Sequence, residues 1–150
     1  MNRNNFDTII FADRKIKNVN IPKSIKYINS NAFFYCKNLT NVDFPNDSEL
    51  KIIRSGAFSN TNIQKITIPK NVCKIEQHCF QYCNELNEVK FEEGSKLGEI
   101  DKNMFYSCKK LKIISIPENS SIKKISKDAF NKCLIENLYI PSNLVELEEE

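Results

Sequence analysis

The stretch AFFYCKNLTNVDFP, residues 32–45, decides the fold because the chain repeats it with small changes. The related stretches are CFQYCNELNEVKFE at 79–92, MFYSCKKLKIISIP at 104–117 and AFNKCLIENLYIP at 129–141. When aligned, their phenylalanines and that of one further unit are 25, 22, 25 and 25 residues apart, at Phe33, Phe58, Phe80, Phe105 and Phe130. A fixed period of roughly 20 to 50 residues indicates a solenoid or another repeat array.

Apolar residues keep a fixed place around each phenylalanine. Five residues before it stands an isoleucine, at Ile28, Ile53, Ile75, Ile100 and Ile125. After it come three more apolar positions, the first unit having Leu39, Val42 and Phe44. The alternation that ends each unit has a period of two, which indicates a short half-buried β-strand.

Proline ends most of these strands, because it has no N–H to donate to a ladder of hydrogen bonds. It occupies positions 22, 45, 69, 117 and 141. The length of the unit varies directly after the strand, where FPNDSEL, FEEGSKL and IPENSSI are longer than IPKSI, IPKNV and IPSNL. Variation at one point of the period predicts an exposed loop along one edge of a stack.

One unit has too few apolar side chains to form a core alone. Stacking at about 4.8 Å between neighbouring strands would place equivalent side chains in columns and build a continuous core. We therefore expect the five phenylalanines to lie in single file.

Cysteines share the register. Cys36, Cys83, Cys108 and Cys133 each follow a phenylalanine by three residues, and we expect Asn60 to take their place in the second unit. Adjacent coils would bring the thiols close together. The favoured interpretation is a column of buried, reduced thiols, which pack as small apolar groups, and the alternative is disulfide pairing.

The pattern of Ala32, Phe33, Cys36 and Leu39, followed by a strand and a proline, resembles the BspA-like class of leucine-rich repeats. The resemblance extends from about Ile16 to Leu147. It implies an α/β fold, a right-handed leucine-rich repeat solenoid. Short parallel β-strands would form one face, with turns and short helical or extended segments opposite.

The same pattern predicts a single solenoid domain over residues 1–150. It would hold about five full repeats of 22–25 residues, with strand-ending segments near 21, 44, 68, 91, 116 and 140, and partial repeats at both ends.

Composition argues against several classes of function. The chain has 22 basic and 19 acidic residues, a net charge of +3, and no basic stripe with interleaved aromatics of the kind that binds nucleic acid. No apolar stretch reaches the roughly 20 residues of a transmembrane helix, and the first segment does not resemble a signal peptide. With three glycines, a phosphate-binding loop is excluded and no cofactor is expected.

The only histidine, His78, is adjacent to Cys79. A cysteine nucleophile needs a converging base and a third group that orients it, and sequence adjacency does not supply these. Cys73, His78, Cys79 and Cys83 are residue types that bind zinc, but they lack the paired C-x2-C spacing of structural zinc sites. We therefore predict neither a catalytic nor a metal site, and expect a buried Cys79 thiol beside an exposed His78 ring.

Recognition is expected on the strand face, where side chains between the buried positions project from a rigid sheet. The predicted ligand-binding residues are Asn41, Asp43, Lys65, Thr67, Glu88, Lys90, Ile113, Ser115, Asn137 and Tyr139. Tyr139, beside the apolar Ile113, is the predicted anchor.

The leading hypothesis is a non-enzymatic module that binds another protein. Resemblance to the BspA-like family implies a surface-associated adhesion protein, with an extracellular matrix or host cell protein as partner. The alternative is an intracellular scaffold or regulatory protein. The resemblance suggests the cell surface, whereas the lack of a recognisable signal peptide suggests the cytoplasm.

Overall fold

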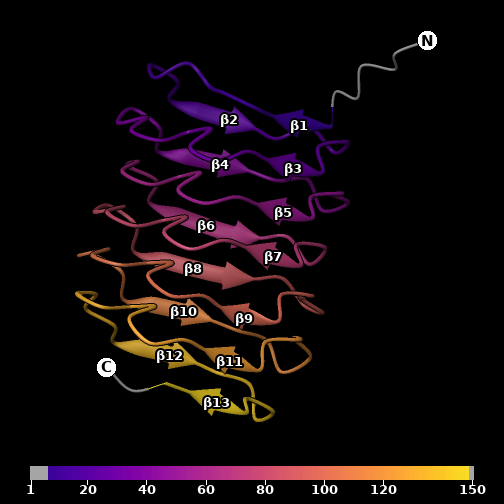
Figure 1. The fold of residues 1–150 in the computed structure, drawn as a ribbon, viewed down its shortest axis with the longest axis vertical. Coiled ribbons are helices and arrows are strands. Elements are labelled where there is room, and N and C mark those ends of the chain that lie inside the picture. The colour runs from indigo at the N-terminus through magenta and orange to yellow at the C-terminus, as the bar shows by residue number, and fades with distance from the viewer. Residues whose placement is uncertain (1–6, 149–150) are drawn as a thin grey trace.

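The structure, a computed structural model, describes residues 7–148 and forms a parallel β-solenoid of about six turns. Each turn places one short strand on each of two faces, as the two stacks of arrows in Figure 1 show. β1 lies at one end of the stack and β13 at the other. The leucine-rich repeat solenoid expected from the sequence is confirmed.

The first face carries the strands that the alternating pattern predicts. These are β2 (Asn18–Asn20), β4 (Asn41–Asp43), β6 (Lys65–Ile68), β8 (Glu88–Phe91), β10 (Ile113–Ser115) and β12 (Asn137–Tyr139). All pairs are parallel and in register from one turn to the next, so that Ile66 lies opposite Val89, for example. The face consists of two sheets, β2–β4 and β6–β8–β10–β12.

The second face is made of two-residue strands around the isoleucine that precedes each phenylalanine. They are β1 (Thr8–Ile9), β3 (Tyr27–Ile28), β5 (Ile52–Ile53), β7 (Lys74–Ile75), β9 (Glu99–Ile100), β11 (Lys124–Ile125) and β13 (Glu146–Leu147). They pair in parallel as β1–β3–β5–β7 and β9–β11–β13. The ladder is therefore interrupted between β7 and β9.

The expected short helical segments are wrong, and so is the α/β class: within residues 7–148 the chain forms strands and turns, and no helix. The segment around each phenylalanine runs through successive turns, in which a backbone N–H donates to the carbonyl three residues earlier, as from Cys36 to Phe33. Two residues in each such segment have positive φ, a conformation that an α-helix cannot contain.

These left-handed residues stand two before and two after each phenylalanine. The first set is Asn31, Gly56, His78, Asn103 and Asp128, and the second is Tyr35, Asn60, Tyr82, Ser107 and Lys132. Glycine, asparagine and aspartate adopt this conformation readily, whereas bulky side chains resist it. The regular turn thus comes from the stack and is not encoded by a single residue type.

The phenylalanines form the single file that the repeat predicts. Ring centroids of successive pairs are 4.9, 5.3, 5.4 and 5.7 Å apart, and the rings are stacked within 15° of parallel. Phe58, Phe80 and Phe105 are fully buried. This spacing is close to the distance between hydrogen-bonded strands, so one ring fits each turn of the solenoid.

The cysteine column differs from the expectation at one position. Thr61, and not Asn60, stands in the second turn, where its hydroxyl donates to the Phe58 carbonyl at 2.9 Å. Asn60 is one of the left-handed residues instead. A hydroxyl and a thiol are both small side chains with one proton to donate, which explains why threonine fits a cysteine column.

The remaining thiols of the column bridge successive turns. Cys83 Sγ donates to the Phe58 carbonyl, Cys108 Sγ to Phe80 and Cys133 Sγ to Phe105, each at 3.1 Å. No disulfide joins the six cysteines, all of which lie in the described part of the chain. The expected buried column is found for Cys36, Cys83 and Cys108, while Cys133 is half-buried.

The longer turns after the strands are not fully exposed, contrary to the expectation for variable loops. Each buries one serine, at Ser48, Ser95 and Ser120. The hydroxyls of Ser95 and Ser120 have no hydrogen-bond partner in the described structure. The two extra residues thus extend the packed interior slightly, and two of the three turns bury a polar atom that is not satisfied.

The last turn is the least covered. Leu138 and Ile140 are 37% and 40% exposed, whereas Val89 and Phe91 at the same positions of an inner turn are 0% and 5% exposed. Apolar side chains in this fold are buried by the neighbouring turns. The contribution of such a side chain to the free energy of unfolding therefore depends on whether a turn covers it on both sides or on one.

We predict that Phe80→Ala lowers the free energy of unfolding by about 3–5 kcal/mol, because it removes a fully buried ring and leaves a cavity. Leu138→Ala, a large-to-small change in the exposed last turn, should cost less than about 1 kcal/mol. Urea unfolding followed by circular dichroism measures both. Equal losses for the two variants would contradict burial by stacking.

Candidate interaction surface

The predicted ligand-binding residues all lie on the first face, on strands β4 to β12. Seven of them are exposed and three, Glu88, Ile113 and Ser115, are half-buried. Between them the inward side chains, such as Val42 and Ile66, are buried. Strand alternation therefore determines which side chains face solvent, and the parallel register fixes the spacing between them.

Three charged residues form a cluster in the middle of this face. Glu88 accepts from Lys65 Nζ at 2.8 Å and from Lys90 Nζ at 2.7 Å. Lys65 lies directly opposite Glu88 in the ladder, and Lys90 is two residues along the same strand. Only 13% of the Glu88 side chain is exposed, so its carboxylate lies close to the sheet. The two ammonium groups that bind it are therefore held at the sheet surface.

Hydrogen bonds from Lys65 and then Lys90 lower the pKa of Glu88, and this effect outweighs the opposing effect of burial. The cluster carries one net positive charge at neutral pH. Its two lysines are ordered by the carboxylate between them, which reduces the entropy that a partner would have to remove on binding.

A groove of about 300 Å³ opens in the face between β4 and β6. The Gln64 N–H donates to the Thr40 carbonyl at 3.2 Å, and beyond this bond β4 and β6 belong to separate sheets. Polar side chains predominate in the groove, which is lined by Asn41, Val42, Asp43, Phe44, Asn46, Lys65, Ile66, Thr67 and Glu92. Four of the predicted binding residues thus share one depression, and within it the Asn41 amide donates to the Asp43 carboxylate.

The far end of the face is more apolar. Ile113 pairs with Asn137 and Ser115 with Tyr139 across the β10–β12 ladder. Tyr139 is 60% exposed, and Leu138 beside it is partly exposed as well. The face therefore changes from a polar groove through a charged cluster to an exposed aromatic side chain.

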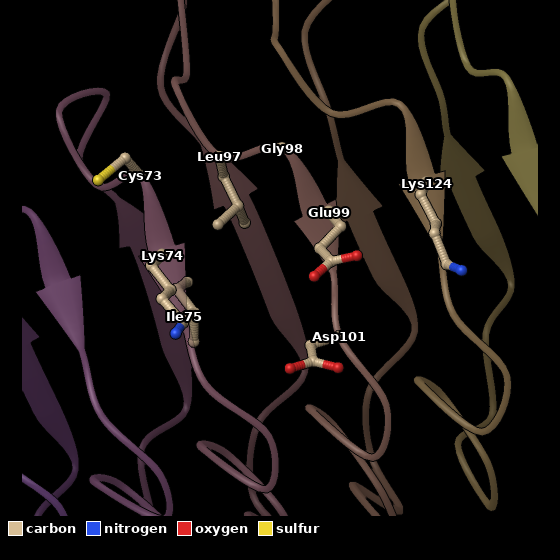
Figure 2. A pocket seen from close by; sticks show the side chains of 8 residues that line it. All are labelled: Cys73, Lys74, Ile75, Leu97, Gly98, Glu99, Asp101 and Lys124. Atoms are coloured by element: carbon tan, nitrogen blue, oxygen red, sulfur yellow. The ribbon is translucent and has the colours of Figure 1, made fainter.

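A second recess, of about 400 Å³, lies on the other face where the ladder is interrupted between β7 and β9 (Figure 2). Its lining combines two lysines, Lys74 and Lys124, with the carboxylates of Glu99 and Asp101. In Figure 2 the carboxylates lie on the β9 side and Lys74 on the β7 side. Sequence reasoning missed this recess because the apolar register continues without change through both turns.

The cysteine and histidine cluster that the sequence singled out does not converge. Cys73 is exposed, Cys79 and Cys83 are buried, and His78 Nδ1 is hydrogen-bonded to Gln81 Oε1 at 2.7 Å. The described residues contain no group of three histidine, cysteine, aspartate or glutamate side chains placed to hold a metal ion. His78 is half-buried, not exposed as expected, because it lies against the next turn in a small recess with Asn103 and Tyr106.

Fold and surface together define a leucine-rich repeat solenoid with a regular strand face. A profile of the BspA type leucine rich repeat region matches six copies, over residues 4–122 and 92–150. The chain belongs to the BspA-type leucine-rich repeat family. Across residues 7–148 there is no helix long and apolar enough to span a bilayer.

Solved structures show the same fold in bacterial proteins. A leucine rich cell surface protein from Faecalibacterium prausnitzii A2-165 has a TM-score of 0.69 and 27% identity, covering 88% of this chain and 35% of that chain. A leucine-rich repeat protein from Eubacterium ventriosum has a TM-score of 0.71 and 21% identity, covering 96% and 45%. The pneumococcal vaccine antigen PcpA has a TM-score of 0.60 and 23% identity, covering 87% and 40%.

This chain therefore spans less than half the length of each of these three structures. The comparison with curated proteins gave no match.

We predict that Glu88 stabilises the fold at neutral pH and loses this effect in acid. Its pKa is lowered in the folded state, so its contribution is present above the unfolded pKa of about 4.3 and disappears as the pH falls through the folded value. Glu88→Gln should be less stable than the parent by up to about 1 kcal/mol at pH 7, and by a smaller amount at pH 3. Urea titrations at both pH values measure this difference.

The control is the same substitution in a chain with Lys65→Met and Lys90→Met. There the effect of Glu88→Gln at pH 7 should fall towards zero. An undiminished effect would mean that the carboxylate acts through other contacts.

We also predict that one thiol reacts rapidly with a thiol reagent in the folded protein. Cys73 is exposed, whereas burial raises the pKa of the Cys79 and Cys108 thiols well above the ordinary value and leaves little thiolate. Cys73→Ser should remove the fast phase, and denaturation should release the buried thiols. Rapid reaction of Cys79 or Cys108 in the folded state would contradict the packed column.

Proposed function

We propose that this protein is a non-enzymatic module that binds a protein ligand on its first strand face, and that it acts at a cell surface in adhesion to host or matrix proteins. The observation that carries the proposal is the Lys65–Glu88–Lys90 cluster beside the β4–β6 groove, a fixed array of charge on a regular sheet. Leucine-rich repeat proteins bind proteins, and a solenoid presents an extended, regular surface for recognition.

The defined positions of the charged side chains support a protein partner. Two lysines held by one carboxylate present positive charge at a defined spacing, which suits an acidic or amide-rich loop. The groove next to them offers side-chain amides and a threonine hydroxyl for hydrogen bonds. Tyr139 provides an exposed aromatic contact at the end of the same face, the residue type that most often contributes binding energy at interfaces.

The surface location is supported by resemblance. The Faecalibacterium protein, at 27% identity, is described as a leucine rich cell surface protein, and adhesion follows from the family resemblance found in the sequence. The second candidate is an intracellular scaffold, which the six cysteines without a disulfide favour, because reduced thiols persist in reducing compartments.

The test is binding of the purified chain to immobilised collagen, laminin and fibronectin, measured by surface plasmon resonance. Thr67→Arg, which places a bulky charged side chain in the groove, should weaken binding at least tenfold. Ser121→Arg adds the same charge at an exposed serine in a turn away from the face, and should leave binding within twofold. The proposal fails if no matrix protein binds at micromolar concentration, or if Thr67→Arg binds as the parent does.

Location requires a separate measurement. Antibodies against the chain should label intact cells of the source organism if the protein is surface-bound. Labelling that requires permeabilised cells would favour the intracellular scaffold.

A further inference from the structure

A shallow recess of about 280 Å³ lies among the turns that follow β7 and β9, away from the strand face. It is lined by His78, Gln81, Tyr82, Asn103 and Tyr106. The residues come from two successive turns, and a hydrogen bond of 2.9 Å from the Tyr82 N–H to the Tyr106 carbonyl joins those turns directly. The spacing of the two tyrosines is therefore fixed by the backbone.

The aromatic rings and the polar groups have a defined arrangement. Tyr82 and Tyr106 meet edge to face, with ring centroids 5.6 Å apart and an angle of 88°. Tyr82 is 40% exposed, so part of its surface is open to solvent. His78 Nδ1 is hydrogen-bonded to Gln81 Oε1 at 2.7 Å, and His78 Nε2 takes no part in that bond.

The backbone of Tyr82 is strained at its position in the turn. It has φ of 58°, a left-handed conformation that an aromatic residue adopts at an energetic cost. Asn60 occupies the equivalent place one turn earlier, where asparagine tolerates the same conformation well. His78, also left-handed, corresponds to Gly56 in that earlier turn. The second turn thus shows that the fold needs neither ring, so two side chains placed on a strained backbone are available for contact with a ligand.

The chemistry of the recess favours a sugar. We propose that it binds a pyranose unit of a glycan, with the sugar C–H groups against an aromatic face and the hydroxyls hydrogen-bonded to the amides and the imidazole. Aromatic faces are negative and attract such C–H groups. Gln81 and Asn103 each offer both donors and acceptors, which suits neighbouring hydroxyls that do both.

The size of the recess argues against a folded protein as its ligand, and its charge argues against a cation. A recess of about 280 Å³ is at the small end of ligand pockets, so it suits one ring of a chain and not a folded partner. No carboxylate lines it, and Lys132 Nζ lies 5.0 Å from the Tyr106 ring centroid, so a cationic group would be repelled. Neutral and acidic sugars fit both conditions.

The experiment is a glycan array of defined oligosaccharides probed with the labelled full chain, followed by titration calorimetry with the oligosaccharides that bind. Tyr82→Asn, which copies the second turn, should weaken binding at least tenfold while keeping or raising the melting temperature. A gain in stability together with a loss of binding is the result that a purely structural tyrosine would not give.

Tyr35→Asn is the matched control. Tyr35 has the same left-handed position in the first turn, with φ of 60°, but lies outside the recess. It should give a similar change in melting temperature and leave sugar binding within twofold. An array without binding, or equal loss from Tyr35→Asn and Tyr82→Asn, would overturn the proposal.

Two further measurements separate this site from the strand face and identify the source of the sugar. Thr67→Arg should leave oligosaccharide binding unchanged, and a tenfold loss would assign the sugar to the groove and overturn the proposal. A glycoprotein that carries the bound sugar should lose its Tyr82-dependent binding after enzymatic deglycosylation. Binding that needs Tyr82 but survives deglycosylation would assign the recess to peptide and overturn the proposal.

Discussion

The contact between equivalent side chains of successive turns is the interaction on which this structure depends. No turn can bury its own apolar residues, because a single turn is only one strand spacing thick. Without neighbours its apolar side chains would be exposed to solvent on both sides. Phe80 is buried because Phe58 and Phe105 stack on its two faces, at 5.3 and 5.4 Å. The strand ladders follow from the same constraint, since hydrogen-bonded strands keep the turns at a spacing that one aromatic ring fills.

Much of the fold was predictable because this constraint appears directly in the sequence as a period. The phenylalanine file, the isoleucine column and the strands of the first face follow from residues that recur at fixed spacing. The family resemblance implied helical segments, and this expectation was wrong because a left-handed residue stands on each side of every phenylalanine of the file and excludes a helix there. Left-handed residues such as Tyr82 and Lys132 were not predictable, because their conformation is imposed by the stack and contradicts their own preference.

The candidate surface was predictable only in outline. Alternation determined that Lys65, Glu88 and Lys90 share one face, but it does not reveal that the Glu88 side chain is largely buried and paired with both lysines. The groove between β4 and β6 and the recess between β7 and β9 occur where ladders stop, although the apolar pattern continues unchanged there. A pattern of residue types reports which side chains are inside, and it carries little information on how closely two strands approach.

The buried serines of the longer turns have a consequence for how such a chain changes over evolutionary time. The hydroxyls of Ser95 and Ser120 lose water on folding and have no hydrogen-bond partner in the described structure, a cost in free energy that the other contacts of these turns must offset. Shorter turns, as in IPKNV, do without them and keep the same register on both sides. The length of this turn can therefore differ by two residues without changing the strand register on either side, whereas the two left-handed residues keep the same spacing about every phenylalanine of the file.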